Sequence, residues 1–196
     1  MKSKSISTSS TCDRELVDIT GLCNPSDVTS VIKNNPYWIQ MYVPETLSIP
    51  TQKPDVEGIN SVNISVNIIR NEVIRTPKSY TTATPPVAVP SLEGKIITGR
   101  KLIIEGELCQ KVEYTANYEE QPVHSAHFFV PFSAFIVVPE TLTFDNADGT
   151  TTTLDSLDIN YDVNACIEDA SVCLIDQRTI LKKVTLLLYA VPAQSC

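Results

Sequence analysis

The amino-acid sequence predicts an all-β protein: an antiparallel β-sandwich or open barrel with an extended N-terminal arm. Two observations carry this prediction. After residue 36, apolar and polar residues alternate through most of the chain, as they do in strands with one buried face. Turn signals such as "TPKS", "LEGK" and "NADG" separate the alternating runs, and no long run has the period of an amphipathic helix.

The chain divides into an N-terminal arm or connector, residues 1–35, and one β domain, residues 36–196. Residues 1–20 are polar and rich in Ser and Thr. Residues 21–35 are expected to form a loop with one short helix after the capping sequence "NPSD". No repeat of 20–50 residues is present in the sequence, so a repeat architecture is not expected.

The strand pattern also assigns faces. In "RKLIIEGELCQKVEYTA" the apolar residues share one face and Cys109 falls on the polar face. In "LDINYDVNACIED" Cys166 likewise falls among polar residues, and "TILKKVTLLLYAV" reads as a more deeply buried final strand. The predicted core contains Val62, Ile64, Val66, Leu102, Ile104, Phe128, Phe132, Ile159, Val163, Leu186 and Leu188.

The stretch "PVHSAHFFVPFSAFIVV" (122–138) invites three interpretations: a metal site, a membrane segment or a core strand. It is shorter than a membrane-spanning helix and is interrupted by Pro131. His124 and His127 are three residues apart, so in a regular strand they point to opposite faces and cannot bind one metal. The strand interpretation is favoured, with Phe135 as a further core candidate, and no metal site is expected.

Composition and motifs disfavour several functions. The net charge of −8, with no basic cluster, argues against nucleic-acid and acidic-membrane partners. There is no GxSxG motif and no phosphate-binding glycine loop, and only two histidines could serve as bases. We therefore expect a protein that is not an enzyme and has no cofactor. The first residues lack the apolar block of a secretory signal, so synthesis in a cytoplasm is expected.

Six cysteines stand out in a chain without a secretory signal. None lies within six residues of another, whereas zinc sites use closely spaced pairs. Cys12 lies in the Ser/Thr-rich arm and Cys196 is the last residue, so neither is expected to be a buried apolar side chain. Cysteines near both ends of the chain suggest cross-links to other chains.

Three segments resemble one known family. They are "PETLSIPTQKPDVE" (44–57), "LIIEGELCQKVEY" (102–114) and "QPVHSAHFFVPF" (121–132), and they occur in the family's order. Residues 36–191 resemble the SPOCS domain family, spore-coat-associated domains of endospore-forming Clostridia and Bacilli. The resemblance implies a role in building a spore layer and transfers no catalytic residue.

The resemblance also gives the cysteines a context. Spore outer layers are assembled in the mother-cell cytoplasm and meet an oxidising environment when that cell lyses, so disulfides can form without a signal peptide. We predict inter-subunit disulfides that involve Cys12, Cys23, Cys109 or Cys196. An internal bridge between Cys166 and Cys173 is a further candidate, if residues 169–170 form a hairpin loop.

Two functions remain. The first is a self-assembling structural subunit of a spore coat, exosporium or surface appendage, whose partner is itself and also other coat proteins. Its arm would pair with an exposed strand edge of a neighbouring subunit, and Cys12 or Cys23 would bond to Cys109 or Cys196 there. The second is a binding module that recruits another coat protein or a glycan to the spore.

Overall fold

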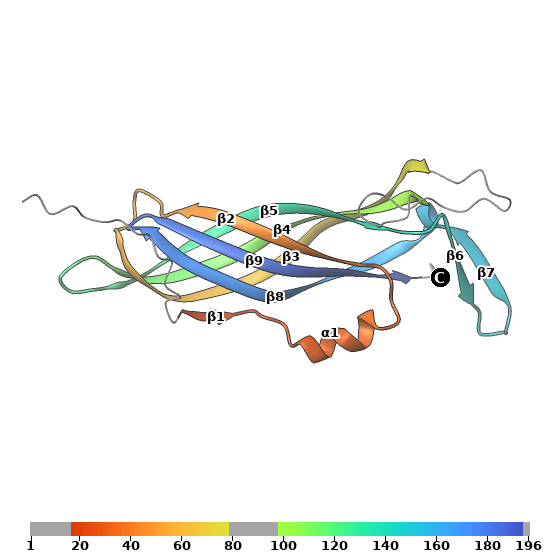
Figure 1. Cartoon of the computed structure of the whole chain (residues 1–196), viewed down its shortest axis with the longest axis horizontal. Helices are drawn as coiled ribbons and strands as arrows, with labels where there is room; N and C mark the ends of the chain where they lie inside the picture. Colours follow the sequence, from red (N-terminus) through yellow and green to blue (C-terminus); the bar gives the residue numbers. More distant parts are fainter. Residues whose placement is uncertain (1–16, 79–97, 194–196) are drawn as a thin grey trace, which may run out of the picture.

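The computed structural model describes residues 17–78 and 98–193, and two facing sheets dominate it. The first sheet has the strand order β1-β3-β4-β5 and the second the order β2-β9-β8. The long axis of the molecule runs along these strands (Figure 1). The strands of the two sheets are β1 (Asp18–Thr20), β2 (Trp38–Ser48), β3 (Val56–Lys78), β4 (Thr98–Ala116), β5 (Val123–Val137), β8 (Asn160–Asp176) and β9 (Thr179–Ala193).

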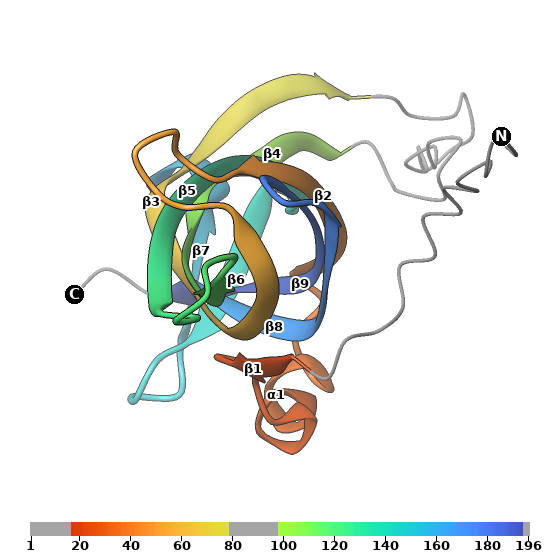
Figure 2. The same cartoon turned by 90° about the vertical axis from the view of Figure 1, so that its left-hand side faces the viewer.

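The two sheets face each other around a common core, as the end-on view shows (Figure 2). At one seam β3 lies beside β8, and at the other β2 lies beside β5. In the described part of the chain no ladder of hydrogen bonds joins the sheets across either seam, so the fold is a sandwich and not a closed barrel. The prediction of an all-β antiparallel fold is confirmed.

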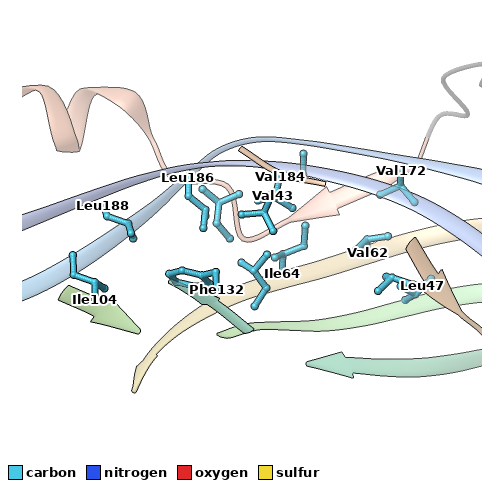
Figure 3. Packing of buried hydrophobic residues seen from close by; sticks show 14 of the residues in the cluster. Val43, Leu47, Val62, Ile64, Ile104, Phe132, Val172, Val184, Leu186 and Leu188 are labelled. Atoms are coloured by element: carbon cyan, nitrogen blue, oxygen red, sulfur yellow. The ribbon is translucent and has the colours of Figure 1, made fainter. Parts of the chain in front are cut away.

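The core is formed by the inward faces of both sheets. Leu102 and Ile104 of β4 and Leu186 and Leu188 of β9 are completely buried, and Figure 3 shows side chains from the two layers meeting. Every residue of the predicted core is either buried or packed against this cluster. Phe135 is the exception among the candidates: it lies on the outward face of β5, where the Lys101 ammonium sits 4.1 Å from its ring centre.

A bulge in β3 changes which residues of that strand face inward. From Val62 to Ile68 the even-numbered residues face the core, but the register with β4 shifts between Ile68 and Arg70. Beyond the shift, Asn71 and Val73 lie opposite the inward Ile104 and Leu102. The second half of β3 and the start of β4 form a ribbon at one end of the molecule (Figure 1).

A small hairpin completes the same end. It consists of β6 (Thr141–Asp145) and β7 (Thr151–Asp155), followed by the 3₁₀ helix η1 (Ser156–Asp158). The buried Arg100 of β4 holds the hairpin, because its Nη2 lies 2.8 Å from Asp155 Oδ2. Hydrogen bonding from Arg100 and from the Leu157 N–H lowers the pKa of the Asp155 carboxyl below its ordinary value.

The predicted short helix is present as α1 (Pro25–Ile32). Asn24 caps it, with Oδ1 accepting a hydrogen bond of 3.1 Å from the Ser26 N–H, and Pro25 occupies the first helical position. Val28 points from the helix onto the outer face of β8 and β9. The division of the chain at residue 36 stays a prediction.

Candidate assembly surfaces

The N-terminal segment is bound to the surface of its own domain. β1 pairs in parallel with β3 over three residues, and the Asn63 side chain donates to Thr20 Oγ1 at 2.8 Å. A few residues further on, the Cys23 N–H donates to the Ile167 carbonyl of β8 at 3.0 Å. Since β3 and β8 belong to different sheets, residues 18–23 bridge the seam between them. Figure 2 shows β1 and α1 together on this side of the sandwich.

A glycine makes this close approach feasible. Gly21 has a φ of +99°, in the region that side chains disfavour. A Cβ at this position would lie 1.9 Å from the Ile64 carbonyl oxygen of β3. The segment therefore reaches the seam only because residue 21 has no side chain.

A disulfide then fixes the segment: Cys23 is bonded to Cys166 of β8. This corrects two predictions. Cys23 is used within its own chain and is not available to a neighbour. Cys166 does face away from the sandwich core, as the alternation predicted, but α1 covers it and only 3% of its surface is exposed.

The predicted internal bridge between Cys166 and Cys173 is also wrong. Residues 169 and 170 do not form a hairpin loop; β8 runs on as one strand from Asn160 to Asp176. Seven residues of extended chain separate the two cysteines by about 23 Å, far beyond disulfide reach. Cys173 is itself disulfide-bonded, but not to Cys166. Cys12 and Cys196, two of the predicted cross-linking residues, lie outside the described residues.

Cys109 is the free cysteine of the described residues. It lies half-buried on the outward face of β4, as predicted, between Ser65 of β3 and Phe129 of β5. The Phe129 side chain is 65% exposed. Desolvation raises the pKa of the Cys109 thiol, and the nearby Glu107 carboxylate, 3.9 Å from Sγ, raises it further. The thiol is therefore partly accessible and ionises at a higher pH than an ordinary cysteine.

The two histidines lie on opposite faces of β5, as the strand geometry required. His124 is half-buried and its ring stacks on Tyr114 with ring centres 6.0 Å apart. His127 faces outward and is exposed. Within residues 17–78 and 98–193, no group of three or more His, Cys, Asp or Glu side chains is arranged to hold a metal ion.

The outward face of β2 carries exposed aromatic side chains that the sequence analysis did not single out. Trp38 is 44% and Tyr42 is 55% exposed. Between them, the Gln40 amide donates to the Glu168 carboxylate at 2.9 Å. Tyr189 lies directly opposite Trp38 on β9. These residues form an aromatic ledge beside α1.

A buried polar cluster was also missed. Glu45, Gln110 and Lys182 lie between the sheets, although their residue types are usually exposed. The alternation contained the signal, because each shares its face with apolar residues two positions away on either side. Glu45 and Gln110 also belong to two of the three segments that carry the family resemblance.

The segments 44–57 and 102–114, which carry part of the family resemblance, meet at one end of the sandwich. Arg178, in the turn between β8 and β9, pairs with Asp55 at 2.6 Å and donates to the Lys53 carbonyl at 2.9 Å. The Tyr114 hydroxyl donates to the Pro54 carbonyl at 3.3 Å. The first segment thus folds over one end of the sandwich, where the second segment ends.

These features define an all-β sandwich domain with a disulfide-tethered N-terminal segment. The family model described as "SipL, SPOCS domain" matches residues 55–175, which is more than half of the chain. The protein therefore belongs to the SPOCS domain family, as the sequence resemblance indicated, and is a sporulation-associated protein. Neither the curated proteins nor the solved structures yield a match. In the described residues, no helix is long and apolar enough to cross a membrane.

Proposed function

We propose that the protein is a self-assembling structural subunit of a bacterial endospore outer layer or surface appendage, cross-linked by disulfides between subunits. It would be made in the mother-cell cytoplasm and reside at the spore surface, in the coat, the exosporium or an appendage. It would act without catalysis, cofactor or nucleic acid. Membership of the SPOCS family supports the link to sporulation.

The outward face around Cys109 is the observation that carries this proposal. A half-exposed free thiol lies there beside Phe129, whose aromatic ring is mostly in solvent. Among the described residues β5 is also the last strand of its sheet, so its outer backbone edge can accept another strand. A neighbouring subunit that buries Phe129 would bring one of its own cysteines to Cys109.

One of the two remaining candidates, Cys12 or Cys196, is the proposed partner of Cys109, because Cys23 is bonded to Cys166 within the chain and Cys173 is also disulfide-bonded. Bond formation removes two protons and two electrons from the two thiols, and oxygen or a small disulfide accepts the electrons after lysis of the mother cell. The raised pKa of the Cys109 thiol keeps its thiolate fraction low at neutral pH. Cross-linking should therefore follow non-covalent contact and become faster as the pH rises.

The arm was predicted to pair with a strand edge of a neighbouring subunit, whereas its described part pairs with β3 of its own chain. In the proposed assembly the pairing of β1 with β3 holds the N-terminal segment on its own subunit and does not connect that subunit to the next. The arm residues that precede it would then extend from a fixed point on the surface towards the neighbour.

Non-reducing gels and electron microscopy of the purified full chain test the proposal. After oxidation by air, the wild type should give a ladder of covalent multimers and visible fibres or lattices. Cys109→Ser should still form particles, but these should dissociate in hot detergent without reductant. Cys23→Ser/Cys166→Ser is the matched control and should keep the ladder. A wild type that stays monomeric, or an unchanged ladder in Cys109→Ser, would contradict the proposal.

The aromatic ledge favours a second function, a non-catalytic module that recruits a glycan to the spore. Exposed Trp38 and Tyr42 with Gln40 between them offer stacking surfaces and a polar contact on the outward face of β2. Such a module would remain a discrete monomer or dimer and would bind soluble oligosaccharides. Loss of glycan binding in Trp38→Ala, in a protein that never forms multimers, would favour this function over the first.

A further inference from the structure

Three polar side chains from three strands meet inside the sandwich. Glu45 of β2 and Lys182 of β9 are direct cross-strand partners in one sheet, and Gln110 reaches them from β4 in the facing sheet. Lys182 Nζ lies 3.1 Å from Glu45 Oε2. The Gln110 Nε2 donates to the same oxygen at 2.8 Å. One carboxylate oxygen therefore holds both the lysine nitrogen and the glutamine carboxamide.

The cluster is closed to solvent. The Lys182 side chain is 0% exposed and the Glu45 side chain 2% exposed. Each of the three residues is flanked on its own strand by two buried apolar residues. These six neighbours are Val43, Leu47, Leu108, Val112, Ile180 and Val184.

Hydrogen bonding in the cluster is incomplete. Lys182 Nζ has Glu45 Oε2 as its ion-pair partner at 3.1 Å but no further hydrogen bond among the described residues. Glu45 Oε1 and Gln110 Oε1 also lack one there. Buried polar groups are nearly always paired, so two oxygens without a partner beside an ammonium with a single partner need an explanation. A buried ion pair with so few hydrogen bonds is a poor stabilising device.

The surroundings of Lys182 make its ammonium easier to deprotonate than that of an exposed lysine. Burial lowers the pKa of the Lys182 ammonium, and the attraction of Glu45 offsets only part of that effect. An ammonium that passes its proton to the adjacent carboxylate becomes a neutral amine, which is a nucleophile. Glu45 Oε2 lies within hydrogen-bond distance, 2.8 Å, of the carboxamide nitrogen that would leave.

We propose that Lys182 and Gln110 form an intramolecular isopeptide bond, with Glu45 as the proton shuttle. The neutral Lys182 Nζ attacks Gln110 Cδ and gives a tetrahedral intermediate. Glu45 donates its proton to Nε2 and takes one from Nζ, the Cδ–Nε2 bond breaks, and ammonia leaves. One amide is exchanged for another, so no oxidant, reductant or cofactor takes part.

The fold supplies what this reaction needs. The reacting groups are buried from bulk solvent and held side by side, which lowers the barrier because the entropy of bringing them together is already lost on folding. Since Lys182 Nζ and Gln110 Nε2 both contact Glu45 Oε2, the reaction would require a rotation about the Lys182 side-chain torsions that brings Nζ to the carboxamide carbon. The resulting bond would join β4 of one sheet to β9 of the other and make the sandwich resistant to heat and to reductants. Such a link is independent of the Cys23–Cys166 disulfide and of assembly.

Intact mass spectrometry of the reduced, alkylated and denatured full chain tests the proposal. The expected mass is below that of the sequence by one ammonia, about 17 Da. A protease digest should contain one branched species that joins the Gln110 peptide to the Lys182 peptide. This measurement needs no variant to fold.

Substitutions of Glu45 and Lys182 test the role of each residue in the proposed reaction. Glu45→Gln keeps the size of the shuttle residue and Lys182→Met removes the nucleophile, so each should have its full sequence mass. Lys183→Met is the matched control, because Lys183 faces outward, and it should show the same loss as the wild type. A wild-type mass equal to that of the sequence would overturn the proposal, and a persistent loss in Glu45→Gln would overturn the role of Glu45.

Discussion

Removal of the Cys23–Cys166 bridge should lower the stability of the domain substantially. The two cysteines are 143 residues apart in the sequence, so the bridge closes most of the chain into one loop. In the chain-entropy description a loop of this length contributes about 5 kcal/mol, while measured values are typically about 2–4 kcal/mol. We expect Cys23→Ala/Cys166→Ala to lose about 2–5 kcal/mol, which corresponds to a fall in Tm of roughly 4–20 °C for a chain of this size.

Thermal unfolding followed by circular dichroism, without reductant, measures this effect. The matched control is Cys109→Ala, which removes a half-buried free thiol and should cost less than about 1 kcal/mol. The double variant should also lose hydrogen-exchange protection in residues 18–32, because α1 packs on the outer sheet face mainly through Val28 and the bridge. A double variant that melts within about 2 °C of the wild type would refute this reasoning.

Three further predictions concern single contacts. Gly21→Ala should release β1 from β3 and raise amide exchange at Ile19 at least about tenfold, whereas Gly58→Ala, where a Cβ meets open space, should not; equal exchange in both would contradict the account. Gly106→Ala should cost about 1–3 kcal/mol in urea unfolding, because the new Cβ would lie 2.6 Å from the Phe132 ring and 2.8 Å from the Asn67 carbonyl; unchanged stability would show that β5 yields there. The lowered pKa of Asp155 gives stability that is present above the ordinary carboxyl value of about 3.9 and is lost as the pH falls through the lowered pKa. Asp155→Asn should therefore be less stable at pH 7 and less sensitive to acid, and a parallel acid-unfolding curve would contradict this.

Alternation predicted the faces of the regular strands well, because every second residue of a strand faces the same way. In β4 it placed Leu102 and Ile104 inside and Cys109 outside, as observed. The same rule places the odd-numbered Phe135 on the face opposite to the even-numbered Phe128 and Phe132. The prediction that Phe135 lies in the core overlooked this difference. The inward and outward faces of regular strands could therefore be predicted from the sequence.

Other features depend on contacts that alternation does not contain. The bulge at Ile68–Arg70 reverses the phase of β3, and a bulge has no reliable sequence signal where no glycine or proline marks it. Cys166 was correctly assigned to the outer face, but its burial depends on where α1 lies. The pairing of Cys23 with Cys166 follows from the parallel docking of three residues on β3, which six cysteines alone could not specify.

The buried cluster illustrates a different limit. Alternation places Lys182 on the same face as Ile180 and Val184, whereas its charge favours an outward position. Because Lys183 is also a lysine, residue type alone does not show which of the two faces inward. Only the facing sheet shows that Glu45 and Gln110 meet this lysine. Sequence pattern assigns a residue to a face, whereas contacts between sheets require the fold.

Isotope mixing tests the central claim, covalent assembly through Cys109, most directly. Unlabelled and ¹⁵N-labelled full chains are purified under reductant, mixed in equal amounts, oxidised by air and digested without reduction. We predict disulfide-linked peptides in which Cys109 from a labelled chain is joined to Cys12 or Cys196 from an unlabelled one, and the reverse. Cys109 found only as a free thiol, or linked only within chains of one isotope, would contradict the account.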